Sequence, residues 1–423
     1  MDLLGLRTLT VISDAVNLIA ESTGERIDIE KIPLDDPATY EMLSRGEAAG
    51  VFQLESSGMR SILRDLKPEV FEDIVALVAL YRPGPLGSGM VVDFIKNKHG
   101  LNRTTYLHPR LEPILKDTYG VILYQEQVMR IASDLAGFTL GEADMLRRAM
   151  GKKKPEIIAG LRAQFVEGAV KNGVDKDIAG QIFDLMEYFA GYGFNKSHSA
   201  AYALITYQTA YLKANYPLPY MAALLTSVKD NADKVAAYIE DCRRMGIEVL
   251  PPDVNESKES FTVAGAKIRF GLAAVKNVGL GAVESIIKSR EAGGPFNGYV
   301  DFCRRLDPRV VNRRVLESLI RCGAFDSLGH RRAQLMAAVD QGLALAQQSQ
   351  RERENGQISL LDLMGERARE VVSISLPDLP EFPEDEMLAM EKEVLGLYIS
   401  GHPLAQYRSA LDRLCTNSAA EIS

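Results

Sequence analysis

Apolar residues recur at the three- and four-residue spacing of a helix with one buried face over most of the chain. From residue 40 to about residue 228, short polar segments containing glycine or proline interrupt this spacing. One is YRPGP at 81–85, where two prolines and a glycine forbid a continuous helix. Another is GYGFN at 191–195, which precedes a helical stretch from Ser199 to Asn215. The pattern predicts one large α-helical domain, preceded by a helix within residues 3–20.

The pattern changes after residue 249. The sequence PPD at 251–253 ends the preceding helix, and residues 260–263 and 267–270 predict the two strands of a short β-hairpin. Helical spacing returns from residue 281 to about residue 346. The predicted fold class is therefore mainly α, with a large helical domain followed by a smaller helical domain that holds a small β-hairpin.

The remaining part of the chain is more polar. The run QQSQRERE at 347–354 predicts a solvated segment. Residues 376–386 contain three prolines and five acids with no base, which is typical of a linker. A last helix is expected over residues 387–398.

Composition places the chain among ordinary soluble proteins of several domains, because 46% of its 423 residues are apolar and 25% are charged. No apolar run reaches the roughly 20 residues of a membrane helix, and the N-terminus has no basic leader. The four cysteines are far apart and form no CxxC pair, which indicates a reducing cytoplasm rather than a disulfide framework. A net charge of −8 argues against coating DNA by bulk attraction, although local basic patches can oppose the average.

One such patch surrounds Met150. Five cations lie within eight residues of sequence, namely Arg147, Arg148, Lys152, Lys153 and Lys154. Guanidinium groups bind phosphate through two parallel hydrogen bonds and ammonium groups act as mobile point charges, so the patch suits a triphosphate or a nucleic-acid backbone. A solvated helix C-terminus, which also favours cations, explains the same residues.

A second polar cluster begins a helix directly after two glycines, at Asn195, Lys196, Ser197 and His198. Backbone N–H groups at a helix start attract anions, and the lysine and histidine add charge and donors. Capping by Asn195 or Ser197 explains part of the pattern equally well. His198 has no second ligand at metal-binding spacing, which disfavours a metal site.

The segment VGLGA at 278–282 has the layout of a helix-hairpin-helix element, which binds DNA without reading its sequence. Two glycines around one apolar residue are expected to turn tightly and bring backbone N–H groups against a phosphate. Residues 301–332 support this reading with eight arginines and four acids. The segment 319–325 is a candidate for a second hairpin, and a plain turn is the alternative for the first.

The sequence QISLL at 357–361 has the form of a short docking peptide, in which the leucines fill a pocket and Gln357 bonds at its edge. Pentapeptides of this kind also occur by chance.

Longer segments of the chain resemble a known family, the C-family replicative DNA polymerases of bacteria, whose catalytic subunit is the DNA polymerase III alpha subunit. Their order and rough spacing match as well, and the resemblance covers essentially the whole chain. The segments are GVFQLESSG at 50–58, ALVALYRPGPL at 76–86, YGVILYQEQVM at 119–129, ADMLRRAMGKKKP at 143–155, FAGYGFNKSHSAAYA at 189–203 and EVLGLYISGHP at 393–403.

The resemblance implies five parts along the chain. They are the end of a palm domain over 1–27, a fingers domain over 28–228, a helix-hairpin-helix DNA-binding and clamp-binding domain over 229–346, a linker with the sliding-clamp motif over 347–386, and over 387–423 a helix leading to an oligonucleotide-binding domain. It also implies the partners: primer–template DNA, an incoming dNTP, the beta sliding clamp and other subunits of the polymerase III holoenzyme. The location implied is the cytoplasm, without a membrane.

The resemblance assigns roles by motif match. The residues expected to bind the triphosphate are Arg147, Arg148, Asn195, Lys196 and His198. Those expected to contact DNA are Lys276, Gly279, Gly281, Arg313 and Arg314. Those expected to bind the clamp are Gln357, Ser359, Leu360 and Leu361, the last at a position where the family prefers phenylalanine. Asp2, on an expected strand DLLGL, matches the third palm carboxylate and is the expected ligand of catalytic Mg²⁺.

In this family two further palm carboxylates come from an earlier segment, which this sequence lacks. The two-metal chemistry of the family needs all three carboxylates. Its phosphoesterase-like domain and thumb are also absent from the sequence. We therefore expect a fragment of such a polymerase that does not synthesise DNA by itself. The alternatives are a non-catalytic DNA- and clamp-binding module and the error-prone paralogue of the same family.

Overall fold

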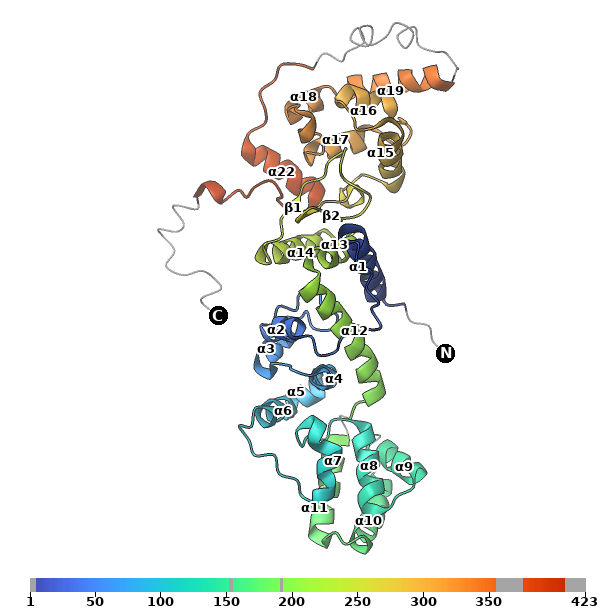
Figure 1. The fold of residues 1–423 in the computed structure, drawn as a ribbon, viewed down its shortest axis with the longest axis vertical. Helices are drawn as coiled ribbons and strands as arrows, with labels where there is room; N and C mark the ends of the chain where they lie inside the picture. The colour runs from blue at the N-terminus through green and yellow to red at the C-terminus, as the bar shows by residue number, and fades with distance from the viewer. Residues whose placement is uncertain (1–4, 152–154, 191–192, 355–375, 408–423) are drawn as a thin grey trace. The chain divides into compact units, whose positions relative to one another are not determined.

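The structure is a computed structural model that describes residues 5–151, 155–190, 193–354 and 376–407 (Figure 1). The chain divides into two compact units. We call residues 27–216 the central unit, and residues 1–26 together with 217–423 the flanking unit.

One part of the central unit is built around two helices that are far apart in the sequence but pack against each other, α4 (Phe71–Leu80) and α12 (Lys196–Asn215). Against them lie α2 (Pro37–Ser44), α3 (Ser57–Leu66) and α6 (Met90–Lys98), and α5 (Pro83–Gly87) packs on α6. Tyr207 of α12 is fully buried, and its hydroxyl donates to the carbonyl of Pro33 at 2.7 Å, which fixes the segment before α2. The predicted helix break at 81–85 is confirmed, since α4 ends at Leu80 and α5 begins at Pro83.

A buried carboxylate organises the start of α4. Asp73 is 1% exposed and accepts hydrogen bonds from the Glu69 amide at 2.9 Å and from the Tyr119 hydroxyl at 3.0 Å. Lys98 approaches it to 3.5 Å from α6. Because each of these partners meets a buried charge, the network ties α6 and the segment after α7 to α4.

The second half of the central unit has its own apolar core. It is built by α7 (Glu112–Leu115), α8 (Gln125–Ala136), α9 (Leu140–Gly151), α10 (Pro155–Lys171) and α11 (Lys176–Ala190), with the short 3₁₀ turns η1 (Pro109–Leu111) and η2 (Lys116–Thr118). Gly137, at a φ of 72°, ends α8 in the left-handed conformation that glycine adopts without strain.

The flanking unit begins with α1 (Arg7–Thr23), which packs on α13 (Pro217–Ser227). Helix α14 (Ala232–Arg244) follows and leads into a three-stranded sheet of order β1-β3-β2. The predicted hairpin is confirmed as β2 (Thr262–Ala264) antiparallel to β3 (Lys267–Arg269). Strand β1 (Val249–Leu250) pairs parallel to β3, and its two residues are too few for an alternating pattern to reveal.

The rest of the flanking unit is helical. It comprises η3 (Leu272–Ala274), α15 (Leu280–Gly293), α16 (Tyr299–Arg305), α17 (Arg313–Arg321), η4 (Asp326–Leu328), α18 (Arg332–Ala337), α19 (Val339–Glu354), α22 (Glu384–Leu395) and η6 (Ala405–Tyr407). No helix in the described parts of the chain is long and apolar enough to cross a membrane.

The structure corrects the expected linker at its two ends. Residues 347–354 are largely exposed, as expected, but they are the last turns of α19 rather than part of a linker. Side-chain pairs four residues apart support these turns, with Gln348 donating to Glu352 at 2.9 Å and Gln350 to Glu354 at 2.8 Å. At the other end α22 begins at Glu384, three residues before the expected start of the last helix.

Candidate nucleic-acid interfaces

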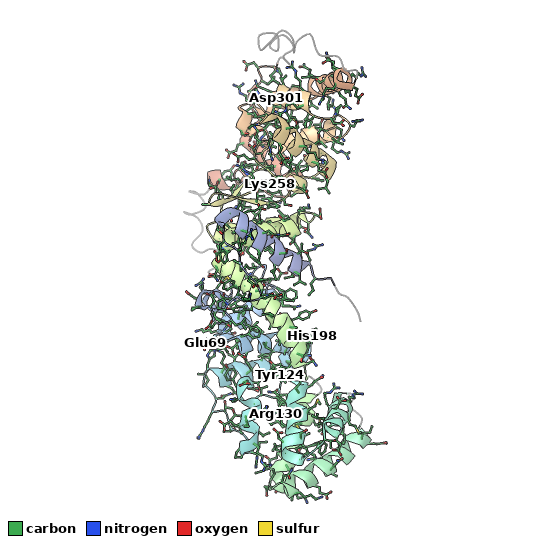
Figure 2. All side chains as sticks on the ribbon, turned by 45° about the vertical axis from the view of Figure 1, so that its right-hand side comes forward. Glu69, Tyr124, Arg130, His198, Lys258 and Asp301 are labelled. Carbon is green, nitrogen blue, oxygen red and sulfur yellow. The ribbon has the colours of Figure 1, made fainter. Side chains whose placement is uncertain are left out.

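In the central unit, two distant segments meet by backbone pairing. The Gln125 amide donates to the Phe194 carbonyl at 2.9 Å, and the Phe194 amide donates to the Leu123 carbonyl at 3.1 Å. This pairing places the N-terminus of α8 beside the N-terminus of α12, and Figure 2 labels Tyr124 and His198 from the two segments. The helix starts at α8 and α12, which are about 70 residues apart in the sequence, therefore form one surface.

The start of α12 is capped within the chain. The Asn195 side chain accepts from the His198 amide at 2.8 Å, as a helix cap does. The Lys196 amide donates to both carboxylate oxygens of Glu126, each at 3.0 Å. Because these two amides already have acceptors, an anion here would meet the exposed Lys196 and His198 side chains rather than those amides.

Arg147 reaches this surface from α9. Its guanidinium donates to Asp144 at 2.7 Å and to the Gln125 side chain at 3.0 Å. Gln125 in turn donates to the Gly193 carbonyl at 3.0 Å. A chain of hydrogen bonds thus joins Arg147 to the segment directly before Asn195.

Arg148, the next residue, is 66% exposed at its side chain and pairs with Asp144 at 2.8 Å. The hydrogen bond from Arg147, with the charges of both arginines, holds the pKa of the Asp144 carboxyl below its usual range. Asp144 is therefore ionised at neutral pH and orients both guanidinium groups. Lys152, Lys153 and Lys154 lie outside the described residues.

The structure adds Arg82 to this surface. Its guanidinium carbon lies 4.3 Å from the centre of the Phe194 ring, and its Nε donates to the Ala79 carbonyl at 2.8 Å. Burial lowers the pKa of Arg82. The cation–π contact with the Phe194 ring offsets part of the cost of removing the guanidinium charge from water. The sequence shows Arg82 directly before the rigid Pro-Gly-Pro segment, which marks it as a residue held in a fixed position. Nothing in the sequence connects that segment to residues 194–198.

In the flanking unit, the GLG hairpin differs from the expected geometry. Neither Gly279 nor Gly281 has a positive φ, and the left-handed residue of the turn is Asn277 at a φ of 68°. The Asn277 side chain donates to the Ser318 hydroxyl at 3.2 Å and so ties the hairpin to α17. A single 3₁₀ turn, η3, precedes the hairpin in place of an α-helix.

What the two glycines provide is open space. A Cβ atom at Gly279 would have no atom within 4 Å, and one at Gly281 would meet only Val310 at 3.7 Å. Gly279 is the N-cap residue of α15, so neither glycine places a side chain beside the first N–H groups of that helix. A phosphate can approach these N–H groups closely.

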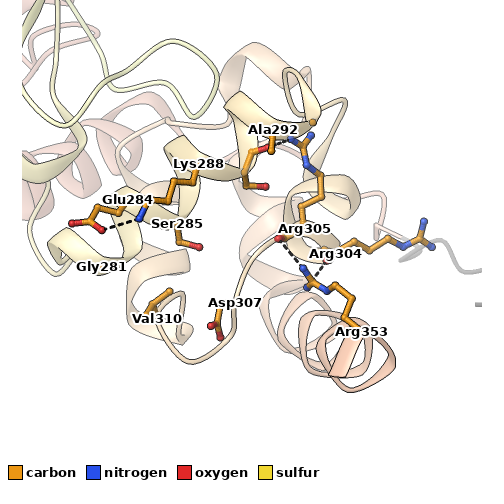
Figure 3. A pocket seen from close by; sticks show the side chains of 12 residues that line it. Gly281, Glu284, Ser285, Lys288, Ala292, Arg304, Arg305, Asp307, Val310 and Arg353 are labelled. Atoms are coloured by element: carbon orange, nitrogen blue, oxygen red, sulfur yellow. Dashed lines mark hydrogen bonds and ion pairs between the residues drawn. The ribbon is translucent and has the colours of Figure 1, made fainter. Parts of the chain in front are cut away.

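A groove of about 840 Å³ extends from Gly281 along α15 (Figure 3). Its charged lining residues are Glu284, Lys288, Arg304, Arg305, Asp307 and Arg353, four cations against two acids. Lys288 is 76% exposed and pairs with Glu284 at 3.4 Å. Arg353 donates to the carbonyls of Arg304 at 3.0 Å and Arg305 at 3.3 Å, which holds α19 against α16.

The other DNA-binding candidates are distributed around the hairpin. Lys276 and Gly279 line a second groove of about 710 Å³, formed with the last three residues of α22 and the Gly396 that caps it. Arg313 pairs with Glu317 at 3.1 Å and with Asp340, and the exposed Arg314 follows it on α17. These two arginines line neither groove.

The expected second hairpin at 319–325 is a tight turn after α17. Gly323 has a φ of 77°, and a Cβ atom there would meet Asp326 at 2.7 Å and the Arg332 guanidinium. This glycine, unlike Gly279, is required by both conformation and space.

The remaining candidates lie outside the described residues: Asp2, Gln357, Ser359, Leu360 and Leu361. Within the described parts of the chain, no group of three or more histidine, cysteine, aspartate or glutamate side chains has the arrangement of a metal site.

Comparison with known proteins finds two matched regions in the chain. Residues 8–173 match the bacterial DNA polymerase III alpha subunit finger domain, and residues 246–335 match a helix-hairpin-helix motif. The DNA polymerase III subunit alpha of Pseudomonas aeruginosa is 49% identical over 446 residues, covering 100% of this chain and 38% of that protein. The Escherichia coli K12 subunit is 49% identical over 97% of this chain and 36% of its own length, and the Thermus aquaticus subunit is 50% identical over 96% and 33%.

This chain thus spans about a third of the length of these relatives. Two family models match parts of this chain, and the relatives align with nearly all of it at 49–50% sequence identity. The chain belongs to the bacterial DNA polymerase III alpha subunit family and carries its finger domain and a helix-hairpin-helix motif.

Proposed function

We propose that this chain provides substrate and DNA binding to a DNA-directed DNA polymerase that takes part in replication. The reaction is template-directed nucleotidyl transfer from a dNTP to the primer 3′-hydroxyl. The central unit, together with residues to about 228, acts as the fingers domain. Residues 1–27 form the end of the palm. Residues 229–346, which follow the fingers domain, act as the DNA-binding and clamp-binding domain, and the clamp-motif linker at 347–386 comes after them.

The observation that carries the proposal is the junction of α8, α9 and α12. Through Gln125 and Gly193, it links Arg147 to the helix start that holds Lys196 and His198. A triphosphate needs several cationic donors converging from different directions, which neither segment offers alone. We assign its binding to Arg147, Arg148, Asn195, Lys196 and His198.

The acids of the junction define how the site works. Asp144 holds the two arginines and Glu126 holds the Lys196 amide. A triphosphate offers more charge than one carboxylate, so it would take over guanidinium hydrogen bonds from Asp144. The arginines therefore stay oriented before the nucleotide arrives, which lowers the entropic cost of binding.

In the flanking unit, we propose that the hairpin and the α15 groove bind the DNA backbone without reading bases. Lys276, Gly279, Gly281, Arg313 and Arg314 form this contact around the hairpin, and Lys288 adds charge on the groove. The expected salt dependence follows from release of phosphate counterions.

The metal and the clamp enter as further proposals. Divalent ions, Mg²⁺ in this family, would activate the primer hydroxyl and stabilise the leaving pyrophosphate. We assign Asp2 as one ligand, with the other carboxylates outside this chain. We assign Gln357, Ser359, Leu360 and Leu361 to the beta sliding clamp, in a cytoplasmic assembly with other holoenzyme subunits.

The nucleotide site is tested by equilibrium binding of a dNTP to the purified chain. We expect Arg147→Ala to weaken binding by about tenfold or more, because it removes a charged bidentate donor. Arg130→Ala is the matched control: Arg130 lies on α8 of the same unit and pairs with Asp134 at 3.3 Å, away from the junction. Equal affinities of the Arg147→Ala variant and the unmodified chain would reject the assigned site.

A further inference from the structure

Four aromatic rings form a continuous row along one side of α12. The Phe52 and Tyr202 ring centres are 5.6 Å apart at an interplanar angle of 31°, and those of Tyr202 and His198 are 4.4 Å apart at 31°. His198 in turn meets Phe194 at 5.4 Å, and Arg82 covers that last ring. The row thus runs from the turn before α3 to the α8–α12 junction.

Phe194 packs against the edge of the apolar core, whereas Phe52, Tyr202 and His198 lie outside it. His198 is exposed and the other three are partly exposed, whereas Tyr207 on the same helix is fully buried and hydrogen-bonded. The helix therefore has one side that packs inside the unit and another that carries the row at the surface. Figure 2 labels His198 of this row. Single exposed rings are common, but several exposed rings in contact with one another are typical of a ligand-binding surface.

The turn that carries Phe52 is held rigidly on α12. The Phe52 amide donates to the Thr209 hydroxyl at 3.1 Å, and the next residue, Gln53, takes a left-handed φ of 64°. Lys213, only 2% exposed, donates to the Ala49 carbonyl at 2.8 Å. A buried lysine and a strained φ are both unfavourable unless something fixes them, so the position of Phe52 is specified from two sides.

The chemistry of the row selects its ligand. The Phe52, Tyr202 and His198 rings are tilted by 31° from one to the next, and the Phe194 ring stands edge-on to His198 at 72°. The exposed faces of such rings accept flat π-systems, and the cations Arg82 and Lys196 at one end bind phosphates. Paired bases in a duplex hide their faces, so a duplex cannot use the row, whereas an unpaired strand offers both bases and phosphates. We infer that the row of Phe52, Tyr202, His198 and Phe194 is a stacking platform for the unpaired bases of single-stranded DNA. The inference rests on the proposed function, in which this strand is the template beyond the primer end.

The test uses the whole chain and a short single-stranded DNA that carries the fluorescent base 2-aminopurine, whose emission falls on stacking. Phe52→Leu and Tyr202→Leu keep apolar bulk but remove a ring face, and each is expected to weaken binding by about tenfold and to reduce the quenching. Tyr202→Phe keeps the ring and is expected to bind like the unmodified chain. Tyr188→Leu is the matched control, because Tyr188 is a 55% exposed tyrosine of the same unit that lies outside the row and meets the Phe189 ring edge-on, at 4.9 Å and 82°.

A second measurement does not depend on any variant folding. An abasic strand of equal length keeps the phosphates but has no bases, and we expect the unmodified chain to bind it at least tenfold more weakly than the complete strand. Equal affinity for the two strands overturns the inference, as does unchanged quenching in folded Phe52→Leu protein.

The dNTP measurement separates this result from the proposed function. If dNTP binding depends on Arg147 while the abasic strand binds normally, only the stacking platform is rejected. If base-dependent strand binding persists while Arg147→Ala leaves dNTP affinity unchanged, the assigned nucleotide site is rejected and the platform stands.

Discussion

Gly168 of α10 lies against the last residue of α8. A Cβ atom at this position would overlap the carbonyl oxygen of Ala136 and come within 3.1 Å of its carbonyl carbon. The contact is with backbone, which has no rotamer to change, so the two helices can approach this closely only at a glycine. Gly160, two turns earlier in the same helix, has no atom within 4 Å of its Cβ position.

This contrast gives a paired prediction. Gly168→Ala is expected to lower the free energy of unfolding by about 1–3 kcal/mol, because the helices must move apart. Gly160→Ala is expected to raise it by about 0.5–1 kcal/mol, because alanine loses less backbone entropy in a helix. Urea denaturation followed by circular dichroism measures both, and the same sign of change for the two variants would contradict the packing described here.

Residue chemistry was only partly predictable from sequence. The capping role of Asn195 was one of two open readings, and it is confirmed by its bond to the His198 amide. The two hairpin glycines were expected to serve the turn, yet the turn depends on Asn277. A sequence motif names the residues of a loop but not which of them takes the unusual φ, since asparagine and glycine both tolerate it.

At the scale of elements, the backbone conformation of the hairpin gives a specific prediction for DNA binding. Because neither Gly279 nor Gly281 has a positive φ and both positions have room, valine at each is compatible with the backbone. The double substitution Gly279→Val and Gly281→Val should leave the helical content intact while covering the N–H groups at the start of α15. We expect at least tenfold weaker binding of duplex DNA at low salt, measured by fluorescence anisotropy.

Gly293 is unsuitable as a control, because its Cβ would meet the Arg305 guanidinium at 2.7 Å. Ala292→Val, on the same helix and at the far end of the groove, provides a matched increase in bulk. Duplex affinity that falls equally in this control would show a general effect of altering α15, and unchanged affinity in the folded double variant would remove the hairpin from the DNA contact.

Residues 376–383, which precede α22, show why the linker was only partly predictable. Glu381 accepts from the Arg332 amide at 2.8 Å and the Ala333 amide at 3.0 Å, so a proline-rich acidic segment docks on the start of α18. The Arg332 side chain, 6% exposed, pairs with Asp326 at 2.7 Å and with the buried Glu391 of α22 at 3.1 Å. Composition indicates that such a segment lacks regular structure, but its partner lies some 50 residues away and leaves no periodic signal.

At the scale of the whole chain, the order of segments sets what can fold alone. The central unit, residues 27–216, is continuous and has two apolar cores of its own. The flanking unit is made from both sides of it, because α1 packs on α13. Four residues of α1 are buried there, namely Val11, Ile12, Ala15 and Ile19. Helical periodicity predicted α1 as a helix, but periodicity alone does not tell which distant helix covers its apolar face.

We therefore expect two truncations to behave differently. A polypeptide of residues 27–216 should unfold cooperatively in urea and retain dNTP binding, because the proposed nucleotide site and the aromatic row both lie within it. Removal of residues 1–26 should destabilise the flanking unit by several kcal/mol, at about 1.5–3 kcal/mol for each large apolar side chain that loses its burial. Hydrogen exchange measured by mass spectrometry assigns the loss to a unit: amides of α13 should exchange faster, while those of α4 and α12 keep their protection. Faster exchange throughout the central unit, or a non-cooperative transition in the isolated one, would mean that its two cores are insufficient and that it depends on the rest of the chain.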